Sequence, residues 1–264
     1  MSLSGTNTGG FLAIKPGVKR FISSVLLAGL FAGLVLTAVQ KIQVTPIIAQ
    51  AEVYEEGAAH AAAIKPASAI ASLPPASSVS TLPPSATEHH HEAQEWEPTN
   101  GIERTLYTVM ANVTMAVGFA LLLGAAILLR GGISGWQEGL LWGLAGYVVV
   151  FVAPSLGLAP EVPGTQAAPL HDRQLWWTAT ATLTAISLAL LVFGRHWSLK
   201  LLAVMLILTP HLLGAPEPQI HGGAAPAELA RAFIVATAIA NGLFWLALGG
   251  AFGFLNRQFG DPKG

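Results

Sequence analysis

Residues 106–129 read LYTVMANVTMAVGFALLLGAAILL, a run of 24 without one charged side chain. An α-helix rises about 1.5 Å per residue and the hydrocarbon layer of a bilayer is about 30 Å thick, so about 20 apolar residues cross it. Five more uncharged windows follow the same pattern: 21–39, 139–158, 174–194, 201–216 and 232–255. The windows predict an all-α, polytopic transmembrane bundle of six spans, or five if the short window at 201–216 does not cross.

The composition agrees with this class of protein. Of the 264 residues, 53% are hydrophobic and 10% are charged, whereas about a quarter of an ordinary soluble domain is charged. The formal charge of −1 gives no indication of a nucleic-acid partner. The chain has no cysteine, which excludes disulfides, thiolate metal sites and iron–sulfur clusters.

The window at 21–39 follows Lys19 and Arg20 and precedes a small-residue triplet at 49–51, which is the order of a secretory signal peptide. A signal h-region has about 7 to 15 residues, fewer than this window contains, and the triplet lies too far beyond the end of the window. We therefore interpret residues 21–39 as an uncleaved first span.

The spans divide the chain into an N-terminal tail (1–20), the first span (21–39), a long loop (40–105), five further spans (106–255) and a C-terminal tail (256–264). In the loop, residues 52–56 are expected to prolong the first helix. Residues 58–87 are rich in Ala, Ser and Pro, bury too little apolar surface to fold, and predict a stiffened, disordered tether.

Lysine and arginine gather on one side of the predicted membrane. With six spans, the side of both termini holds eight basic residues and two acids, and the opposite side holds five basic residues and twelve acids. Cytoplasmic loops carry the excess of Lys and Arg, so we expect a multi-pass protein of the cell inner (plasma) membrane with both termini in the cytoplasm.

Metal-ligand chemistry falls on the predicted outer side, which holds seven of the eight histidines. Imidazole and carboxylate donors without thiolate suit borderline divalent ions such as Co²⁺, Ni²⁺ and Zn²⁺. The segment Glu88-His89-His90-His91-Glu92 can chelate either as a helix or as an extended strand, although a short histidine run on a tether is also a plain solvated segment. We favour metal capture.

A second candidate is the segment PHLLGAPEPQIHGG at 210–223. A helix that begins near Leu199 would place His211 about 18 Å along it, in its outer half, beside the interruption that Pro210 makes in the backbone hydrogen bonds. A polar ring in hydrocarbon needs a partner, so we expect a site there with Glu217 and His221 nearby. The alternative is that the helix has already ended and His211 is solvated at the interface.

Other polar residues at the outer ends of the spans have plain structural interpretations. Asp172 and Arg173 could pair with each other, and Glu103 and Arg104 could form an ion pair or a gate at the rim. Trp96, Trp176 and Trp177 fit an interfacial aromatic belt. For the hydroxyls of Thr180, Thr184 and Ser187, which share one helical face, we expect hydrogen bonds to carbonyls one turn back rather than a polar pathway.

Small residues indicate where helices cross closely, because close backbone approach replaces the hydrophobic drive inside lipid. The GxxxG spacing occurs at Gly29 and Gly33, at Gly249 and Gly253, and twice at Gly135, Gly139 and Gly143.

Several stretches together resemble the CbtA-type predicted cobalt transporter subunits: AEVYE at 51–55, the histidines at 89–91, WEPTNGIERT at 96–105, LWGLAG at 141–146, APSLGL at 153–158 with Glu161 and Pro163-Gly164, DRQLWW at 172–177, and the 210–223 segment. The resemblance covers about residues 20–256. It implies cobalt uptake, a link to cobalamin synthesis, and a small single-span partner of the CbtB type. The chain departs from the family in residues 58–87 and in an N-terminal extension.

These observations lead to one hypothesis and a rival. The hypothesis is a non-enzymatic membrane subunit that takes up a divalent ion as its substrate, with cobalt favoured over nickel or zinc. Its expected partners are the lipid bilayer and a CbtB-type subunit, and a homo-oligomer is possible. Capture ligands would be Glu52, Glu55, His89, His90 and His91; the entrance or transit site would hold Glu103, Glu161, Asp172, His211, Glu217 and His221. The rival is a membrane-anchored metal-binding or sensory protein that does not transport.

Overall fold

The computed structural model describes residues 16–70, 98–99, 101–219 and 222–258, and the regular structure within them is helical apart from one isolated β-bridge. The all-α prediction is confirmed. Five helical segments are long and apolar enough to cross a membrane: Gly17–Ala61, Ile102–Arg130, Trp136–Ser155, Leu170–Phe193 and Ala227–Gln258. The histidines at 89–91 and His221 lie outside the described residues.

The first span is part of one long helix, formed by α1 (Pro16–Val39), the π-helical turn η1 (Gln40–Val44) and α2 (Thr45–Ile70). The π-turn lies just before Pro46, which has no N–H to continue the regular ladder. Residues 52–56 prolong the first helix as predicted. Residues 58–70 are helical rather than part of the predicted tether, because the alanine-rich stretch at 58–63 has high helix propensity; the rest of that prediction falls on residues 71–87, outside the described residues.

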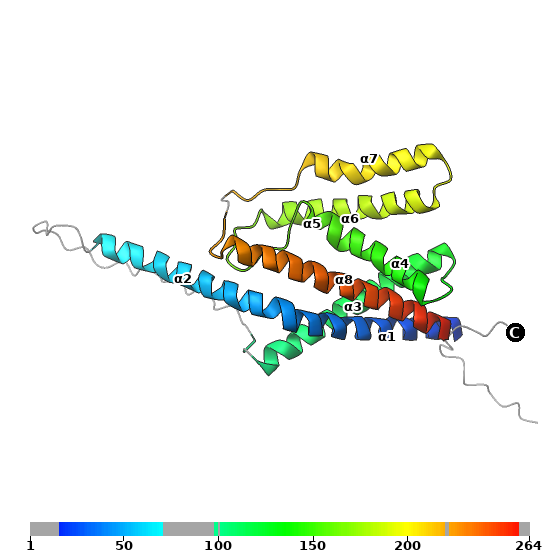
Figure 1. The fold of residues 1–264 in the computed structure, drawn as a ribbon, viewed down its shortest axis with the longest axis horizontal. Helices are drawn as coiled ribbons and strands as arrows, with labels where there is room; N and C mark the ends of the chain where they lie inside the picture. The colour runs from blue at the N-terminus through cyan, green and yellow to red at the C-terminus, as the bar shows by residue number, and fades with distance from the viewer. Residues whose placement is uncertain (1–15, 71–97, 100, 220–221, 259–264) are drawn as a thin grey trace, which may run out of the picture.

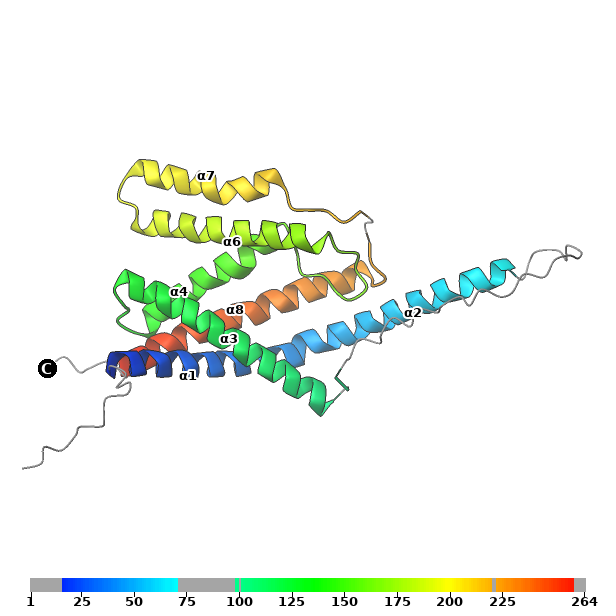
Figure 2. The ribbon, with the colours of Figure 1, turned by 180° about the vertical axis from the view of Figure 1, so that it is seen from behind.

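The remaining helices run back and forth beside it (Figure 1). They are α3 (Ile102–Arg130), α4 (Trp136–Tyr147) continued by η2 (Val148–Val152) and α5 (Ala153–Ser155), α6 (Leu170–Phe193), α7 (Trp197–Leu213) and α8 (Ala227–Gln258). The short fifth window forms α7, which has 17 residues and a length of about 25 Å. Both views show α7 antiparallel to α6 and beside it at the edge of the bundle (Figures 1 and 2).

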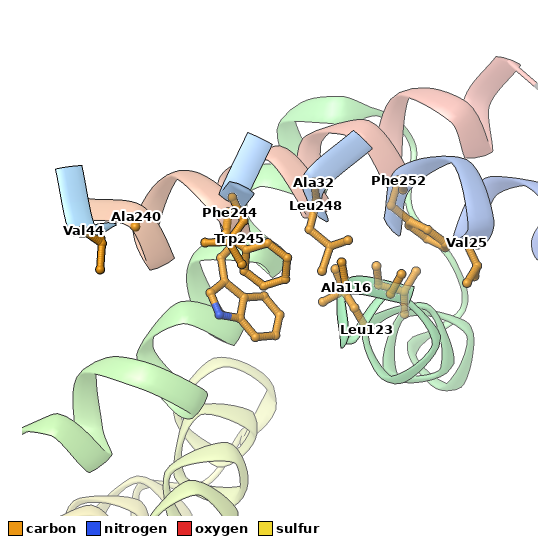
Figure 3. Packing of buried hydrophobic residues seen from close by; sticks show 14 of the residues in the cluster. Val25, Ala32, Val44, Ala116, Leu123, Ala240, Phe244, Trp245, Leu248 and Phe252 are labelled. Carbon is orange, nitrogen blue, oxygen red and sulfur yellow. The ribbon is translucent and has the colours of Figure 1, made fainter. Parts of the chain in front are cut away.

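Helix α8 lies at the centre and packs against α1 and α4, with a smaller contact to α3. Its side chains Phe244, Leu248 and Phe252 are fully buried, and Figure 3 shows them beside the small residues Ala32 and Ala116 of the neighbouring helices. Phe252 also meets Phe21 edge-on, at 6.1 Å between ring centroids. The α6–α7 pair joins this core through η2 and α5.

The glycine spacings mark the two closest helix crossings, as predicted. A Cβ on Gly29 or Gly33 would lie 2.8 or 2.7 Å from the Cα of Val117 or Val113, so α1 and α3 touch there backbone to backbone. A Cβ on Gly139 would lie 2.2 Å from the carbonyl oxygen of Gly249, at the crossing of α4 and α8. Both crossings depend on residues without a side chain.

The described charges separate to the two ends of the bundle. One end, here called the basic end, holds six basic residues and Glu138; its basic residues are Lys19, Arg20, Arg130, Arg195, Lys200 and Arg257. The opposite, acidic end holds eight acids and five basic residues; its acids are Glu52, Glu55, Glu56, Glu103, Glu161, Asp172, Glu217 and Glu228. The placement of the acidic end outside the cell stays a prediction from the charge rule.

Candidate functional site

A pocket of about 600 Å³ opens at the acidic end, between α6, α7 and α8. Its walls come from the α5–α6 loop, from the α7–α8 loop, and from side chains at the ends of the three helices. Three predicted site residues, Glu161, His211 and Glu217, line this pocket although they are up to 56 positions apart in the sequence.

The two loops that carry the carboxylates are held against each other. Thr165 and Gly223 form an antiparallel bridge, and the backbone N–H of Ala224 donates to the carbonyl of Gly164 at 3.4 Å. Gly214, with φ +85°, ends α7 and turns the chain into the Pro216–Pro218 stretch. After this turn Glu217 lines the same pocket as Glu161 of the other loop.

His211 lies in the last turn of α7, half-buried against Trp176 of α6. Their ring centroids are 6.0 Å apart at an interplanar angle of 73°, and the indole Nε1–H donates to the carbonyl of Pro210 at 3.3 Å. His211 is therefore still within α7 and lies in the wall of the pocket, so the helix has not ended before it. Trp176 is a pocket wall, a role that the aromatic-belt interpretation missed.

The carboxylate of Glu161 is paired with the guanidinium of Arg173, at 3.3 Å between the nearest nitrogen and oxygen. The expected pairing of Asp172 with Arg173 is wrong: Asp172 instead lies 3.4 Å from the ring nitrogen of its neighbour His171, exposed at the start of α6. Adjacent helical residues point about 100° apart, which explains why Arg173 turns toward the pocket loop and Asp172 away from it.

The acids on α2 and α3 are engaged away from the pocket. Glu52 forms an ion pair with Arg104 at 2.7 Å, and the rim pair between Glu103 and Arg104, one of the two alternatives left open by the sequence, is not formed. Glu103 instead accepts hydrogen bonds from the backbone N–H and the hydroxyl of Thr99, just before α3. Glu55 packs beside Gly164, on the same loop as Glu161.

Among the described residues, no group of three or more His, Asp or Glu side chains converges closely enough to hold a metal ion. The pocket nevertheless provides two carboxylates and one imidazole around a space large enough for a hydrated divalent ion. This donor set has the chemistry expected for a borderline divalent metal.

A row of hydroxyls on α6 differs from the prediction. Thr180, Thr184 and Ser187 are fully buried, and their hydroxyl oxygens have no hydrogen-bond partner among the described residues. Thr178 on the same helix does bond to the carbonyl of Gln174, at 2.7 Å. A buried hydroxyl without a hydrogen-bond partner destabilises the fold by about 1 to 3 kcal/mol. Three such hydroxyls on one face of α6 therefore need an explanation.

Replacement of Arg173 by alanine is expected to strengthen divalent-ion binding at the pocket, because it removes the cation that neutralises Glu161. Both side chains are about one-third exposed, so solvent screens the pair and the gain is modest, about 0.5 to 1 kcal/mol or roughly two- to five-fold in Kd. Isothermal titration calorimetry of the purified variant and wild type with Co²⁺ measures this change in Kd. Lys41→Ala removes one positive charge near Thr105, outside the pocket, and is the matched control; an equal gain there would contradict a local effect.

The comparisons with known proteins bear on the whole chain. A family model described as "Probable cobalt transporter subunit (CbtA)" matches residues 18–257. No curated protein and no solved structure matches the chain.

Proposed function

The chain belongs to the CbtA family of probable cobalt transporter subunits, and from this premise we propose that it carries a divalent transition-metal ion as its substrate across the membrane. The ion would enter at the acidic end and pass through the helix bundle to the basic end. Cobalt is the proposed ion before nickel or zinc. The observation that carries the proposal is the family match over 18–257, which covers all the described helices except the first residues of α1 and the last residue of α8.

The pocket at the acidic end is the proposed entrance. Glu161, His211 and Glu217 line it and supply donor atoms suited to a borderline ion. In the sequence His221 precedes Gly222, whose carbonyl accepts a hydrogen bond from Gln166 of the α5–α6 loop, and His221 is proposed as a further ligand. Asp172 and Glu103 would act at the rim, and Glu52, Glu55, His89, His90 and His91 would capture the ion before it enters.

The charge at the acidic end supports capture, since a surface rich in carboxylates raises the local concentration of cations. We place this end outside the cell and both termini in the cytoplasm, on the positive-inside rule. A small single-span subunit of the CbtB type is the proposed partner, and a link to cobalamin synthesis follows from the same resemblance. We propose no chemical catalysis.

The rival function is metal binding at the acidic end without transport. One observation favours it: the uncharged windows at the centre of the apolar spans carry no Asp, Glu, Lys or Arg to couple ion movement to protons. A transporter of this build would depend on the membrane potential or on another subunit for its driving force.

Vesicles that contain the purified chain, alone and with the proposed partner, separate the two functions. With a metal-sensitive dye inside, added Co²⁺ is expected to quench the dye at a rate that increases with an inside-negative potential. Empty vesicles give the leak. Binding of Co²⁺ to the outside of the vesicles, with no quenching above the leak in either preparation, would contradict transport and favour the rival.

A further inference from the structure

The unpartnered hydroxyls of α6 lie in register with the pocket. Trp176 forms part of the pocket wall, and Thr180, Thr184 and Ser187 follow it by four, eight and eleven residues. At 100° per residue all three fall within about 80° of Trp176 on the helix, and they extend about 16 Å along it from the pocket. The row therefore continues inward from the wall of the proposed entrance.

One contact shows which neighbour the row faces. At the outer end Trp176 donates to the carbonyl of Pro210 on α7, the helix against which α6 chiefly packs. The three hydroxyls fall within about 80° of Trp176 on α6, so the row is directed toward α7. In α7, Ala203 is fully buried.

The hydroxyls are not held by their own helix. Thr37, Thr108, Thr178, Thr209 and Thr237 each donate to the carbonyl four residues back, which is the usual solution for a threonine in a membrane helix. Thr180, Thr184 and Ser187 are as buried as any residue of the chain and make no such bond. Their oxygens are thus available to a polar species that enters the interface.

We propose that Thr180, Thr184 and Ser187 line the path by which a hydrated divalent cation leaves the pocket, and that Trp176 closes the outer end of this path. The inference rests on the proposed function and adds a route to it. Neutral hydroxyl oxygens can replace some waters of the ion without binding it so firmly that it stays. Helix α7 packs chiefly against α6, so the two can separate without disturbing the α1–α8 core.

The first test removes the hydroxyls and keeps the shape. The triple variant Thr180→Val, Thr184→Val, Ser187→Ala should take up Co²⁺ into vesicles at least ten-fold more slowly than the wild type, with an unchanged Kd for Co²⁺ and an unlowered melting temperature. Thr178→Val, on the same helix but outside the row, should transport normally. Unchanged uptake by the triple variant would overturn the path and leave the proposed function intact, whereas absent uptake by the wild type would contradict the proposed function itself.

The second test measures whether water-soluble molecules reach the proposed path, and it needs no transport. Because the chain has no cysteine, a single introduced thiol is its only one. In vesicles, Thr184→Cys should react with a charged, water-soluble thiol reagent, and Trp176→Ala in the same chain should increase the rate several-fold. Ile186→Cys, whose side chain is 45% exposed on the outside of the bundle, is the matched lipid-facing control. Equal reactivity of the 184 and 186 thiols, or no effect of Trp176→Ala, would overturn the proposal whatever the uptake assay gives.

Discussion

Gly139→Ala is expected to destabilise the bundle strongly although it adds one methyl group. The new Cβ would lie 2.2 Å from the carbonyl oxygen of Gly249 and 3.1 Å from the Cα of Gly253, and both are backbone atoms that cannot rotate away. Helices α4 and α8 would have to separate along the whole crossing. Overpacking of this kind costs about 1 to 3 kcal/mol and more where the backbone is involved, which should appear as a lower melting temperature in detergent.

Gly118→Ala is the matched control, because Gly118 lies within α3 and an added Cβ there would meet nothing within 4 Å. Alanine has the higher helix propensity, so this variant should be as stable as the wild type or slightly more stable. If both alanine variants melt at the wild-type temperature, the α4–α8 crossing is looser than the structure describes.

The second large effect is expected at His211. His211→Ala should lower the initial rate of Co²⁺ uptake at least ten-fold, equivalent to about 1.4 kcal/mol, because it removes the one imidazole that lines the described pocket. Since the ring also packs against Trp176, His211→Phe is the sharper variant: it keeps an aromatic ring at the 6.0 Å contact and removes both nitrogen donors.

His196, just before α7 at the basic end, provides the control for histidine loss as such. His196→Ala should transport at the wild-type rate. Wild-type uptake by His211→Phe would remove His211 from the path of the ion and would leave Glu161 and Glu217 as the donors to test.

The helical class, the spans and their close crossings were predictable from the sequence, because each depends on a local signal. Uncharged windows give the spans, and the GxxxG spacings at Gly29, Gly139 and Gly249 mark contacts that the structure confirms. The extension of the first helix to Ile70 was underestimated, since the Pro and Ser content of residues 58–87 as a whole concealed the alanine-rich start of that stretch.

The partners of the charged residues were less predictable, because they depend on which loops meet. Neighbours in sequence suggested pairs for Arg104 and Arg173, but each pairs with an acid from a distant segment, Glu52 and Glu161. The grouping of Glu161, His211 and Glu217 in one pocket likewise needs the bridge between the α5–α6 and α7–α8 loops. The spacing of Trp176, Thr180, Thr184 and Ser187 was visible in the sequence, whereas the lack of hydrogen-bond partners was not.

The continuous helix from Pro16 to Ile70 determines where the next part of the chain starts. Among its residues up to Ala61, the last that is fully buried is Ala51, and 19 further residues carry the helix about 28 Å beyond it. The number of residues in the helix fixes both the axial position of its C-terminal end and the direction in which that end faces about the helix axis. Removal of seven residues would shift the end by about 10 Å along the axis and rotate it by only about 20°, whereas removal of five would rotate it by about 140°. The point at which the helix ends, and the direction it faces there, are thus set by how many helical turns precede Ile70.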